Sequence, residues 1–344
     1  MKTLRIITLL VIALNITACR KDDYIETKEI ITDVYVAGYE VRNGNAVATL
    51  WKNGIATHLS TTDKMTSANS VYVSGSDVYV VGYESINGAT KARLWKNGVA
   101  SDLSNGSNNQ SIATSVAVNG NKVYVAGYES PAFGGPTRAI IWENGLAVSL
   151  TNGVYSARAN SVFISGNDFY AGGFESNGNI SVAKIWKNGN STSLSAGIKN
   201  AGINAVYVSG SDVYATGTEN IGTQTVARIW KNGVATTLPS TAGNYYGRAI
   251  FVAGSDVYAA GYDIKNGVVK PAFWKNNTAV TISSDNNQGE VTSMFVIGTD
   301  VYLCGYESNN TTIAKVWKNG QAQNLTDGSD TAVASGIFVT QTQK

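Results

Sequence analysis

The chain has 344 residues, enough for one large or two medium-sized domains, and 43% of them are hydrophobic, which excludes a disordered protein. One histidine (His58) and two cysteines (Cys19 and Cys304) are too few for a Cys/His zinc site or a disulfide scaffold, and they argue against histidine-dependent catalysis. The formal charge is +2, but without Lys2 and Arg5 of the N-terminal leader 24 basic residues face 24 acidic ones, so no basic excess remains for nucleic acid or an anionic membrane.

The N-terminus has the layout of an export signal. Two basic residues precede an apolar stretch at 6–14 that is too short to span a bilayer, and residues 16–19 read Ile-Thr-Ala-Cys. These four residues resemble a bacterial lipobox, in which the signal is removed before a cysteine that then carries lipid. We therefore predict a lipoprotein signal peptide at 1–18, a lipidated Cys19 and a flexible tether at 19–31. An ordinary signal peptide with an incidental cysteine is the alternative.

The sequence Arg-Lys-Asp-Asp at 20–23 follows this cysteine directly. It resembles the surface-export signal of Bacteroidota lipoproteins, which implies an outer-membrane protein that is lipid-anchored and exposed at the cell surface. A solvated tether of the same composition is the plainer explanation. No later stretch is long and apolar enough to predict a transmembrane helix, so the lipid would be the membrane attachment.

Seven copies of one unit follow the tether. Every tryptophan of the chain occupies the same place in the unit, 43 to 47 residues from the next: Trp51, Trp95, Trp142, Trp186, Trp230, Trp274 and Trp317. Six of them are followed by Lys or Glu and then Asn-Gly, a pair that favours the tight turn of a β-hairpin. One tryptophan per unit at a constant place predicts a packing role between sheets rather than a cofactor site.

Each unit contains four short β-rich runs. In the second unit the expected strands are 70–73, 77–84, 91–95 and 99–103. Four short antiparallel strands in about 44 residues are typical of a propeller blade, and no segment shows helical periodicity. The first strands of the units centre on Tyr72, Ala117, Phe163, Tyr207, Phe251, Phe295 and Phe338.

The chain enters the repeats at Asp33 with a second strand and leaves at 337–339 with a first strand. The C-terminal strand should therefore complete the N-terminal blade and leave the ring without an unpaired joint. We predict an all-β fold, a single seven-bladed β-propeller of four-stranded antiparallel blades at 32–344, acting as a monomer. A linear solenoid is the alternative, but it would need polar caps that the sequence does not show.

The region 33–339 resembles repeat β-propellers, and its Trp-Lys-Asn-Gly unit looks like secreted or lipid-anchored propellers of Bacteroidota. This resemblance implies a surface lipoprotein and no particular activity. The sequence lacks the Trp-Asp ending of one well-known propeller family and the Ser-x-Asp-x-Gly-x-x-Trp box of the sialidase-like propellers.

An acidic residue ends each second strand: Glu40, Glu84, Glu129, Glu175, Glu219, Asp263 and Glu307. Two interpretations are open, a carboxylate ring that binds cations and an ion pair inside each blade. Six third strands carry a base two or four residues before the tryptophan: Arg93, Arg138, Lys184, Arg228, Lys270 and Lys315. Hairpin pairing would bring each base close to its acid, and Arg42 can take this place in the first blade. We favour the ion pairs, and we expect no metal and no cofactor.

Two further repeated positions and one cysteine are interpreted as structural. The aspartates that open most second strands are expected to cap the preceding turn, with Lys122 as the exception. The glycine inside each second strand, such as Gly82, should mark the close approach of a neighbour. Cys304 lies in an apolar run and is expected to be buried and inert.

Function in a propeller is expected in the variable loops and at the channel mouth. Subtracting the repeated positions leaves few aromatic residues, and two of the loops that contain them also contain arginine. The candidate ligand-binding residues are Phe133, Tyr155, Arg158, Tyr245, Tyr246 and Arg248. Packing of these side chains on their own blades is the alternative, because exposed Tyr and Arg are typical of recognition surfaces without being specific to them.

The sequence predicts a non-catalytic binding module. A nucleophilic triad would need His58, which lies on an expected outermost strand, and the repeated acids lack the asymmetry of a catalytic pair. A glycan or another extracellular ligand is expected at the variable loop face, and the surface-export signal and the non-repeated aromatic residues both fit a glycan. A protein-interaction scaffold at the outer membrane is the first alternative, and a hydrolase is the second.

Overall fold

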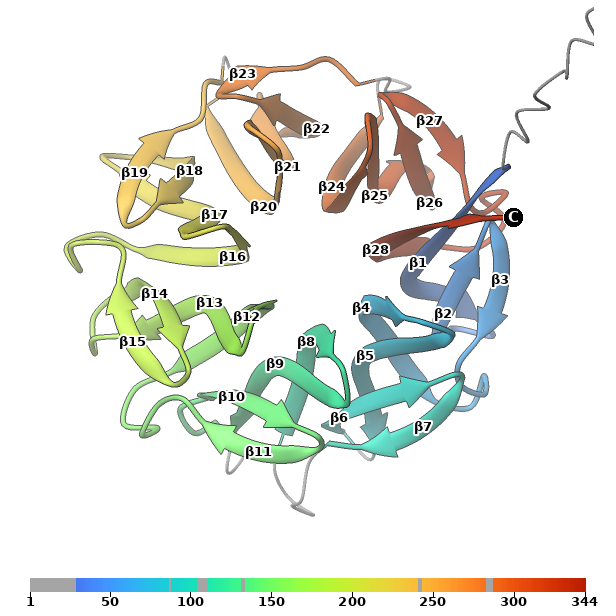
Figure 1. Ribbon diagram of the computed structural model, residues 1–344, viewed down its shortest axis with the longest axis horizontal. Helices are drawn as coiled ribbons and strands as arrows, with labels where there is room; N and C mark the ends of the chain where they lie inside the picture. Colours follow the sequence, from blue (N-terminus) through green and yellow to red (C-terminus); the bar gives the residue numbers. More distant parts are fainter. Residues whose placement is uncertain (1–28, 87, 104–109, 131–133, 241–242, 283–286) are drawn as a thin grey trace, which may run out of the picture.

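The computed structural model describes residues 29–86, 88–103, 110–130, 134–240, 243–282 and 287–344. They form seven four-stranded antiparallel sheets arranged as blades around a central axis (Figure 1), which confirms the predicted seven-bladed β-propeller. The predicted signal peptide, Cys19 and Phe133 lie outside the described residues.

The strands are given blade by blade, starting from the axis. Blade 1 contains β28 (Ala332–Gln343), β1 (Ile30–Arg42), β2 (Asn45–Lys52) and β3 (Ile55–His58). Blade 2 contains β4 (Met65–Ser74), β5 (Asp77–Ile86), β6 (Ala89–Lys96) and β7 (Val99–Asp102). Blade 3 contains β8 (Gln110–Asn119), β9 (Lys122–Ser130), β10 (Arg138–Glu143) and β11 (Leu146–Ser149). Blade 4 contains β12 (Ala157–Ser165), β13 (Asp168–Ser176), β14 (Ser181–Lys187) and β15 (Asn190–Ser193).

The remaining three blades repeat this order. Blade 5 contains β16 (Ala201–Ser209), β17 (Asp212–Ile221), β18 (Gln224–Lys231) and β19 (Val234–Thr237). Blade 6 contains β20 (Asn244–Ala253), β21 (Asp256–Lys265), β22 (Val268–Lys275) and β23 (Thr278–Ala279). Blade 7 contains β24 (Gln288–Ile297), β25 (Asp300–Asn309), β26 (Thr311–Lys318) and β27 (Gln321–Asn324).

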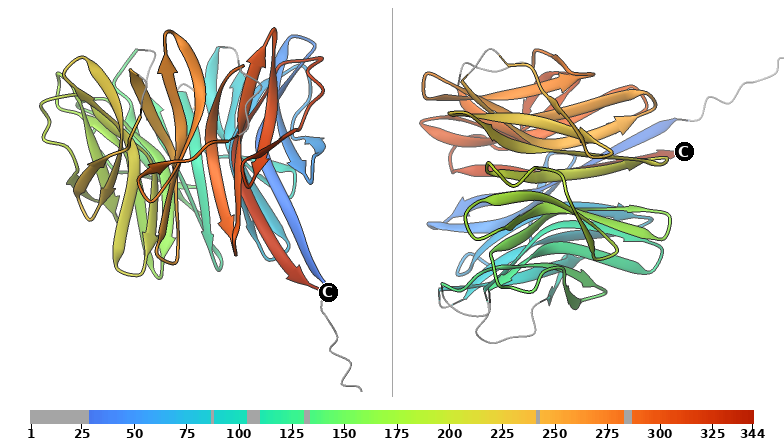
Figure 2. Two further views of the ribbon diagram at one scale, coloured as in Figure 1. Left: turned by 90° about the horizontal axis from the view of Figure 1, so that it is seen from above. Right: turned by 90° about the vertical axis from the view of Figure 1, so that its left-hand side faces the viewer.

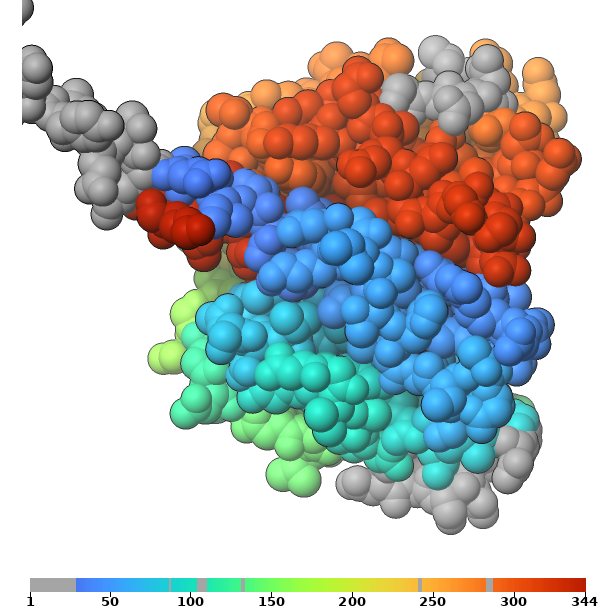
Figure 3. All heavy atoms as spheres, turned by 90° about the vertical axis from the view of Figure 1, so that its right-hand side faces the viewer, coloured from blue at the N-terminus to red at the C-terminus, as the bar shows by residue number. Residues whose placement is uncertain are grey.

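The ring is closed by the two ends of the chain. β28 pairs with β1 from Ile30 opposite Gln343 to Glu40 opposite Ala332, which confirms the predicted closure. β1 begins at Ile30, so the last residues of the predicted tether belong to this strand. The pair extends beyond the other blades as a two-stranded ribbon (Figure 2), and Figure 3 shows the two ends side by side where they project from the body.

The two faces of the propeller differ in their connections. One face, here called the loop face, contains the loops between second and third strands and the links between blades. The opposite face, here called the turn face, contains the short turns after the first strands and the Asn-Gly turns before the fourth strands. The described chain enters at Ile30 and ends at Lys344 on the turn face, because β1 starts and β28 finishes there.

The tryptophans form the core between neighbouring blades, as predicted. Their side chains are between 0% and 2% exposed, and each one packs against the blade that precedes it. Trp95 of blade 2, for example, contacts Tyr35, Ala37 and Ala48 of blade 1. Burial of such large side chains removes much apolar surface from water, which makes the blade contacts the main source of stability.

The Trp-Lys-Asn-Gly turn holds the start of the second strand in place. In blade 2, Asn97 adopts a positive φ of 50°, donates through Nδ2 to Asp77 at 2.8 Å and accepts the backbone N–H of Val78 at 2.8 Å. Lys96 forms an ion pair with Asp77 at 2.8 Å. Asp77 therefore binds the turn of the neighbouring hairpin, and the prediction that it caps its own turn is wrong.

Blade 3 reverses the charges of this contact. Lys122 occupies the place of the aspartate, Glu143 occupies the place of the lysine, and the two side chains form an ion pair at 2.9 Å. The same geometry with exchanged signs explains why Lys122 is the exception among the repeated aspartates, because the pair requires opposite charges but no fixed order of them.

Candidate functional site

The central channel is lined by a β-bulge in every innermost strand. One extra residue occurs at the same place in each blade, three residues before the first-strand centre. These residues, here called the bulge ring, are Asn69, Thr114, Asn160, Asn204, Arg248, Thr292 and Ser335. A bulge redirects a side chain away from the regular ladder.

Five members of the bulge ring link their blade to the next one through a backbone carbonyl. The hydrogen bonds run from Asn69 to Ala113, Thr114 to Ala159, Asn160 to Ile203, Asn204 to Gly247 and Thr292 to Ala334, at 2.7 to 2.8 Å. Polar residues recur at the matching place in every unit, but the sequence alone did not predict this ring. These five contacts serve blade packing. They leave Ser335 and Arg248, and of these two only Arg248 has a charge.

The channel encloses a cavity of about 480 Å³. The bulge ring lines its middle, and below the ring lie aromatic side chains at the first-strand centres. Their centroids are 4.6 to 5.3 Å apart along five neighbouring pairs of Tyr72, Phe163, Tyr207, Phe251, Phe295 and Phe338. Ala117 replaces the seventh aromatic residue. Among the described residues that line the cavity, Arg248 is the only one with a charge.

Arg248 also belongs to a cluster at the loop-face end of the channel, here called the Arg-Tyr cluster. Its guanidinium lies 5.3 Å from the ring centroid of Tyr262, and its Nη2 lies 3.5 Å from Glu290 Oε2. Tyr262 stacks on Tyr246 with centroids 4.6 Å apart and planes inclined by 15°. Tyr306 belongs to the same cluster, because it lies opposite Glu290 in the β24–β25 pair. Burial, and then the charge of Glu290, raise the pKa of the Tyr306 hydroxyl to about 12.

Three predicted residues contact an aromatic ring of a second strand at this end of the channel. Tyr246 and Arg248 lie together in the Arg-Tyr cluster. Arg158 of blade 4 occupies the place that corresponds to Tyr246, and its guanidinium lies 4.3 Å from the ring centroid of Tyr128. The structure thus brings two of the candidates into one cluster and places the third on another blade of the same mouth.

The other two described candidates, Tyr155 and Tyr245, take no part in these contacts. Tyr155 is 47% exposed in the link before β12, where its ring contacts Gly178 of the same blade. Tyr245 is only 8% exposed and packs against Leu238 and Trp274, so the expectation that it is exposed is wrong. β20 already begins at Asn244, and alternation along a strand turns neighbouring side chains to opposite faces, so Tyr245 is buried beside the half-buried Tyr246.

An aromatic rim, which was not predicted from the sequence, surrounds the loop-face mouth. The residue after each second-strand glycine is aromatic in six blades: Tyr39, Tyr83, Tyr128, Phe174, Tyr262 and Tyr306. Blade 5 has Thr218 at this place, and Thr218 faces Gly202 on the innermost strand. The aromatic rim is therefore interrupted in blade 5, between blade 4, which contains Arg158, and blade 6, which contains Arg248.

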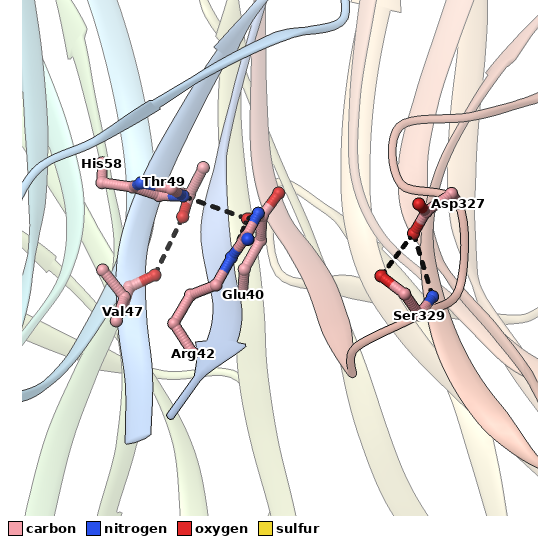
Figure 4. Close-up of polar contacts among 7 residues, drawn as sticks. All are labelled: Glu40, Arg42, Val47, Thr49, His58, Asp327 and Ser329. Atoms are coloured by element: carbon pink, nitrogen blue, oxygen red, sulfur yellow. Dashed lines mark hydrogen bonds and ion pairs between the residues drawn. The ribbon is translucent and has the colours of Figure 1, made fainter. Parts of the chain in front are cut away.

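Five of the seven repeated acids form ion pairs inside their blades. Glu40 binds Arg42 at 2.6 Å and His58 at 3.0 Å (Figure 4), which confirms that Arg42 takes the place of the missing third-strand base. Glu84 binds both Arg93 and Lys64. The three remaining pairs, at 2.5 to 3.5 Å, are Glu175 with Lys184, Glu219 with Arg228 and Glu307 with Lys315.

Two acids of this set differ. Burial raises the pKa of Glu129 and of Asp263, and the nearby bases oppose this shift only in part. Within the described ranges, no group of three or more His, Cys, Asp or Glu side chains could hold a metal ion. Cys304 is fully buried, as predicted, and burial raises the pKa of its thiol to about 12.

No protein-family model matches the chain, and no curated protein matches it. Among solved structures, the chain is similar to the computationally designed Ika8 protein, with a TM-score of 0.45, 18% identity and coverage of 85% of this chain and 86% of that one. It is similar to TolB from Acinetobacter baumannii, with a TM-score of 0.49, 9% identity and coverage of 71% and 61%. It is also similar to the Pyrococcus horikoshii acylaminoacyl peptidase, with a TM-score of 0.49, 11% identity and coverage of 87% and 51%.

The chain spans less than two thirds of the last two proteins, and none of the three similarities transfers a function to it. The described residues contain no helix long and apolar enough to cross a membrane. Its own blades define the class of the protein: a seven-bladed β-propeller, a fold consistent with a binding or scaffold module.

Proposed function

We propose that this protein is a non-catalytic binding module that holds a glycan at the loop-face mouth of its channel. The observation that carries the proposal is the Arg-Tyr cluster. Most repeated side chains are explained by packing, ion pairs or links between blades. Arg248, in contrast, departs from the neutral residues of the bulge ring, and it lies beside Tyr246 and Glu290, which occupy a first-strand place that differs in every blade. Departures from a repeat that the fold does not require are where function is expected.

The chemistry of the cluster fits a sugar. The stacked rings of Tyr246 and Tyr262 offer an apolar surface to the C–H face of a pyranose, and neither ring is fully buried. Arg248 supplies several N–H donors, and Glu290 supplies carboxylate acceptors. A sugar hydroxyl can therefore accept from Arg248 and donate to Glu290. A concave, partly aromatic site with a few convergent polar groups is typical of small-ligand recognition.

The position of the chain ends supports a lipid-anchored arrangement. The propeller begins at Ile30 on the turn face, so a lipid on Cys19 would hold that face toward the outer membrane. The loop face, with its mouth, would then point away from the membrane toward extracellular ligands. We propose this surface-exposed arrangement for a monomeric propeller that needs no cofactor.

The anchor is tested by the substitution Cys19→Ser in the full chain. Without the thiol no lipid can be attached, so we expect the protein to move from the membrane fraction to the soluble fraction. Immunoblots of separated fractions measure this change, with the unchanged protein as the control. Retention of the variant in membranes at the wild-type level would contradict lipid anchoring through this residue.

The binding function is tested with residues 24–344, which contain the whole closed ring. We expect retention on at least one immobilised polysaccharide, weakened roughly tenfold by Tyr246→Ala, because an aromatic stack contributes about 1 kcal/mol or somewhat more. Affinity electrophoresis over a polysaccharide panel measures the effect. The control is Tyr83→Ala, which removes a rim tyrosine opposite Ser67 in blade 2, whereas the Arg-Tyr cluster belongs to blades 6 and 7.

Equal weakening by the two variants would argue against the cluster as the binding site. A panel without any retention would contradict glycan binding. A protein recovered in stoichiometric amount from outer membranes would then favour the scaffold function.

A further inference from the structure

Arg248 lies both at the loop-face mouth and in the lining of the cavity. It contacts Tyr262 and Glu290 at the loop-face end, and it also lines the 480 Å³ cavity as the one charged member of the described lining. The corresponding places in the other blades hold Asn, Thr or Ser, most of which link two blades. The fold therefore accepts a small neutral residue here, and the guanidinium is not needed for ring closure.

The guanidinium of Arg248 has N–H donor capacity that the described residues do not use. Its Nε is buried and has no hydrogen-bond partner among the described residues, and its Nη2 makes a long contact of 3.5 Å with Glu290. The side chain is 39% exposed, so a ligand can reach it. Because a buried donor without a partner costs free energy, the arrangement favours an incoming acceptor.

The surroundings of Arg248 restrict the kind of acceptor. A guanidinium presents a planar pair of donors that matches a carboxylate. Asn160 and Asn204 each use Nδ2 to bind the next blade, and their side-chain carbonyls remain as acceptors for hydroxyl groups. The rings of Tyr207 and Phe251 lie below them, and the volume falls in the range of about 300–1,000 Å³ typical of small-molecule sites.

We propose that the channel binds the carboxylate of an acidic sugar, a uronate, with Arg248 as its anchor. This inference rests on the proposed glycan function and specifies the ligand class of the same site. The carboxylate takes donors from the guanidinium, the bulge-ring amides accept hydroxyl hydrogen bonds, and the tyrosines of the cluster contact the ring.

Glu290 acts as the competing counter-ion. It lies 3.5 Å from Arg248 and is itself largely buried, so it holds the guanidinium at the mouth when no ligand is present. An incoming carboxylate must displace this long contact and meets repulsion from the same side chain. Removal of the charge of Glu290 should therefore strengthen the binding of an acidic sugar, whereas removal of Arg248 should abolish it.

The experiment compares sodium D-galacturonate with D-galactose by calorimetric or NMR titration of residues 24–344. We expect galacturonate to bind at least about tenfold more tightly than galactose. Arg248→Asn should remove this preference, and it should fold normally, because three other blades have Asn at the same place. Glu290→Gln should tighten galacturonate binding several-fold. Arg158→Asn, at the mouth but outside the cavity lining, is the matched control and should keep the preference.

The inference is overturned if galactose binds as tightly as galacturonate, or if Arg248→Asn keeps the preference while its melting temperature is unchanged. If sodium acetate binds as tightly as galacturonate, the site recognises an anion without recognising a sugar, and this result would also overturn the inference. Binding of neutral glycans that depends on Tyr246 alone would leave the proposed function standing and reject the uronate. Absence of binding by any sugar would reject both.

Discussion

Deletion of residues 333–344 is expected to abolish cooperative folding of the propeller. The deletion removes nearly all of β28, the innermost strand of blade 1, and with it the buried Ile337 and Val339 and the ring of Phe338. Each large apolar side chain contributes roughly 1.5–3 kcal/mol when fully buried, and the stability of a domain is only about 5–15 kcal/mol. The loss also exposes the backbone edges of β1 and opens the ring between blades 7 and 2.

Circular dichroism and a thermal melt of the truncated chain measure this effect. The control is a shorter deletion of residues 341–344, which lie in the ribbon beyond the blades and are exposed. We expect the shorter deletion to change the melting temperature little, because it removes no buried side chain. A 333–344 deletion that melts like the intact chain would show that β28 is not the closing strand.

The repeat made the fold predictable, because seven copies repeat every signal of a blade. The tryptophans, the Asn-Gly turns and the offset between Asp33 and Phe338 together specify the blade, the number of blades and the closure. The contact between Lys96 and Asp77 was missed because each residue already had a local explanation, in the turn that follows Trp95 and in the turn that precedes Val78. A pairing between two turns of different hairpins becomes visible only when the register of the sheet is known.

The site was less predictable, for two physical reasons. Subtraction of repeated positions retained Tyr246 and Arg248, which do depart from the pattern, but it discarded Tyr262 and Tyr306, which follow it and still line the mouth. The same subtraction retained Tyr245, whose burial depends on where β20 begins. Glu290 was not recognised because its importance comes from the bulge at Arg248, which directs the guanidinium across the boundary between two blades.

Gly82→Ala is expected to destabilise the propeller by roughly 3 kcal/mol or more, because overpacking against rigid backbone is among the most costly substitutions. A Cβ at Gly82 would overlap the backbone carbonyl of Ser67 and would lie 3.0 Å from Ala68 Cα. Neither group can rotate away, since both belong to the innermost strand β4 where it pairs with β5. Urea unfolding followed by fluorescence of the buried tryptophans measures the change.

The matched control is Gly202→Ala on β16. A Cβ there would have Phe174 Cβ as its nearest neighbour at 3.7 Å, an ordinary contact, so we expect a change within about 1 kcal/mol. The comparison also explains why the second-strand glycine recurs in every blade. The bulge at Asn69 brings the carbonyl of Ser67 over Gly82, and the same bulge directs the Asn69 amide to Ala113 of the next blade. The glycine is thus required by the bulge, and equal losses in the two variants would contradict this explanation.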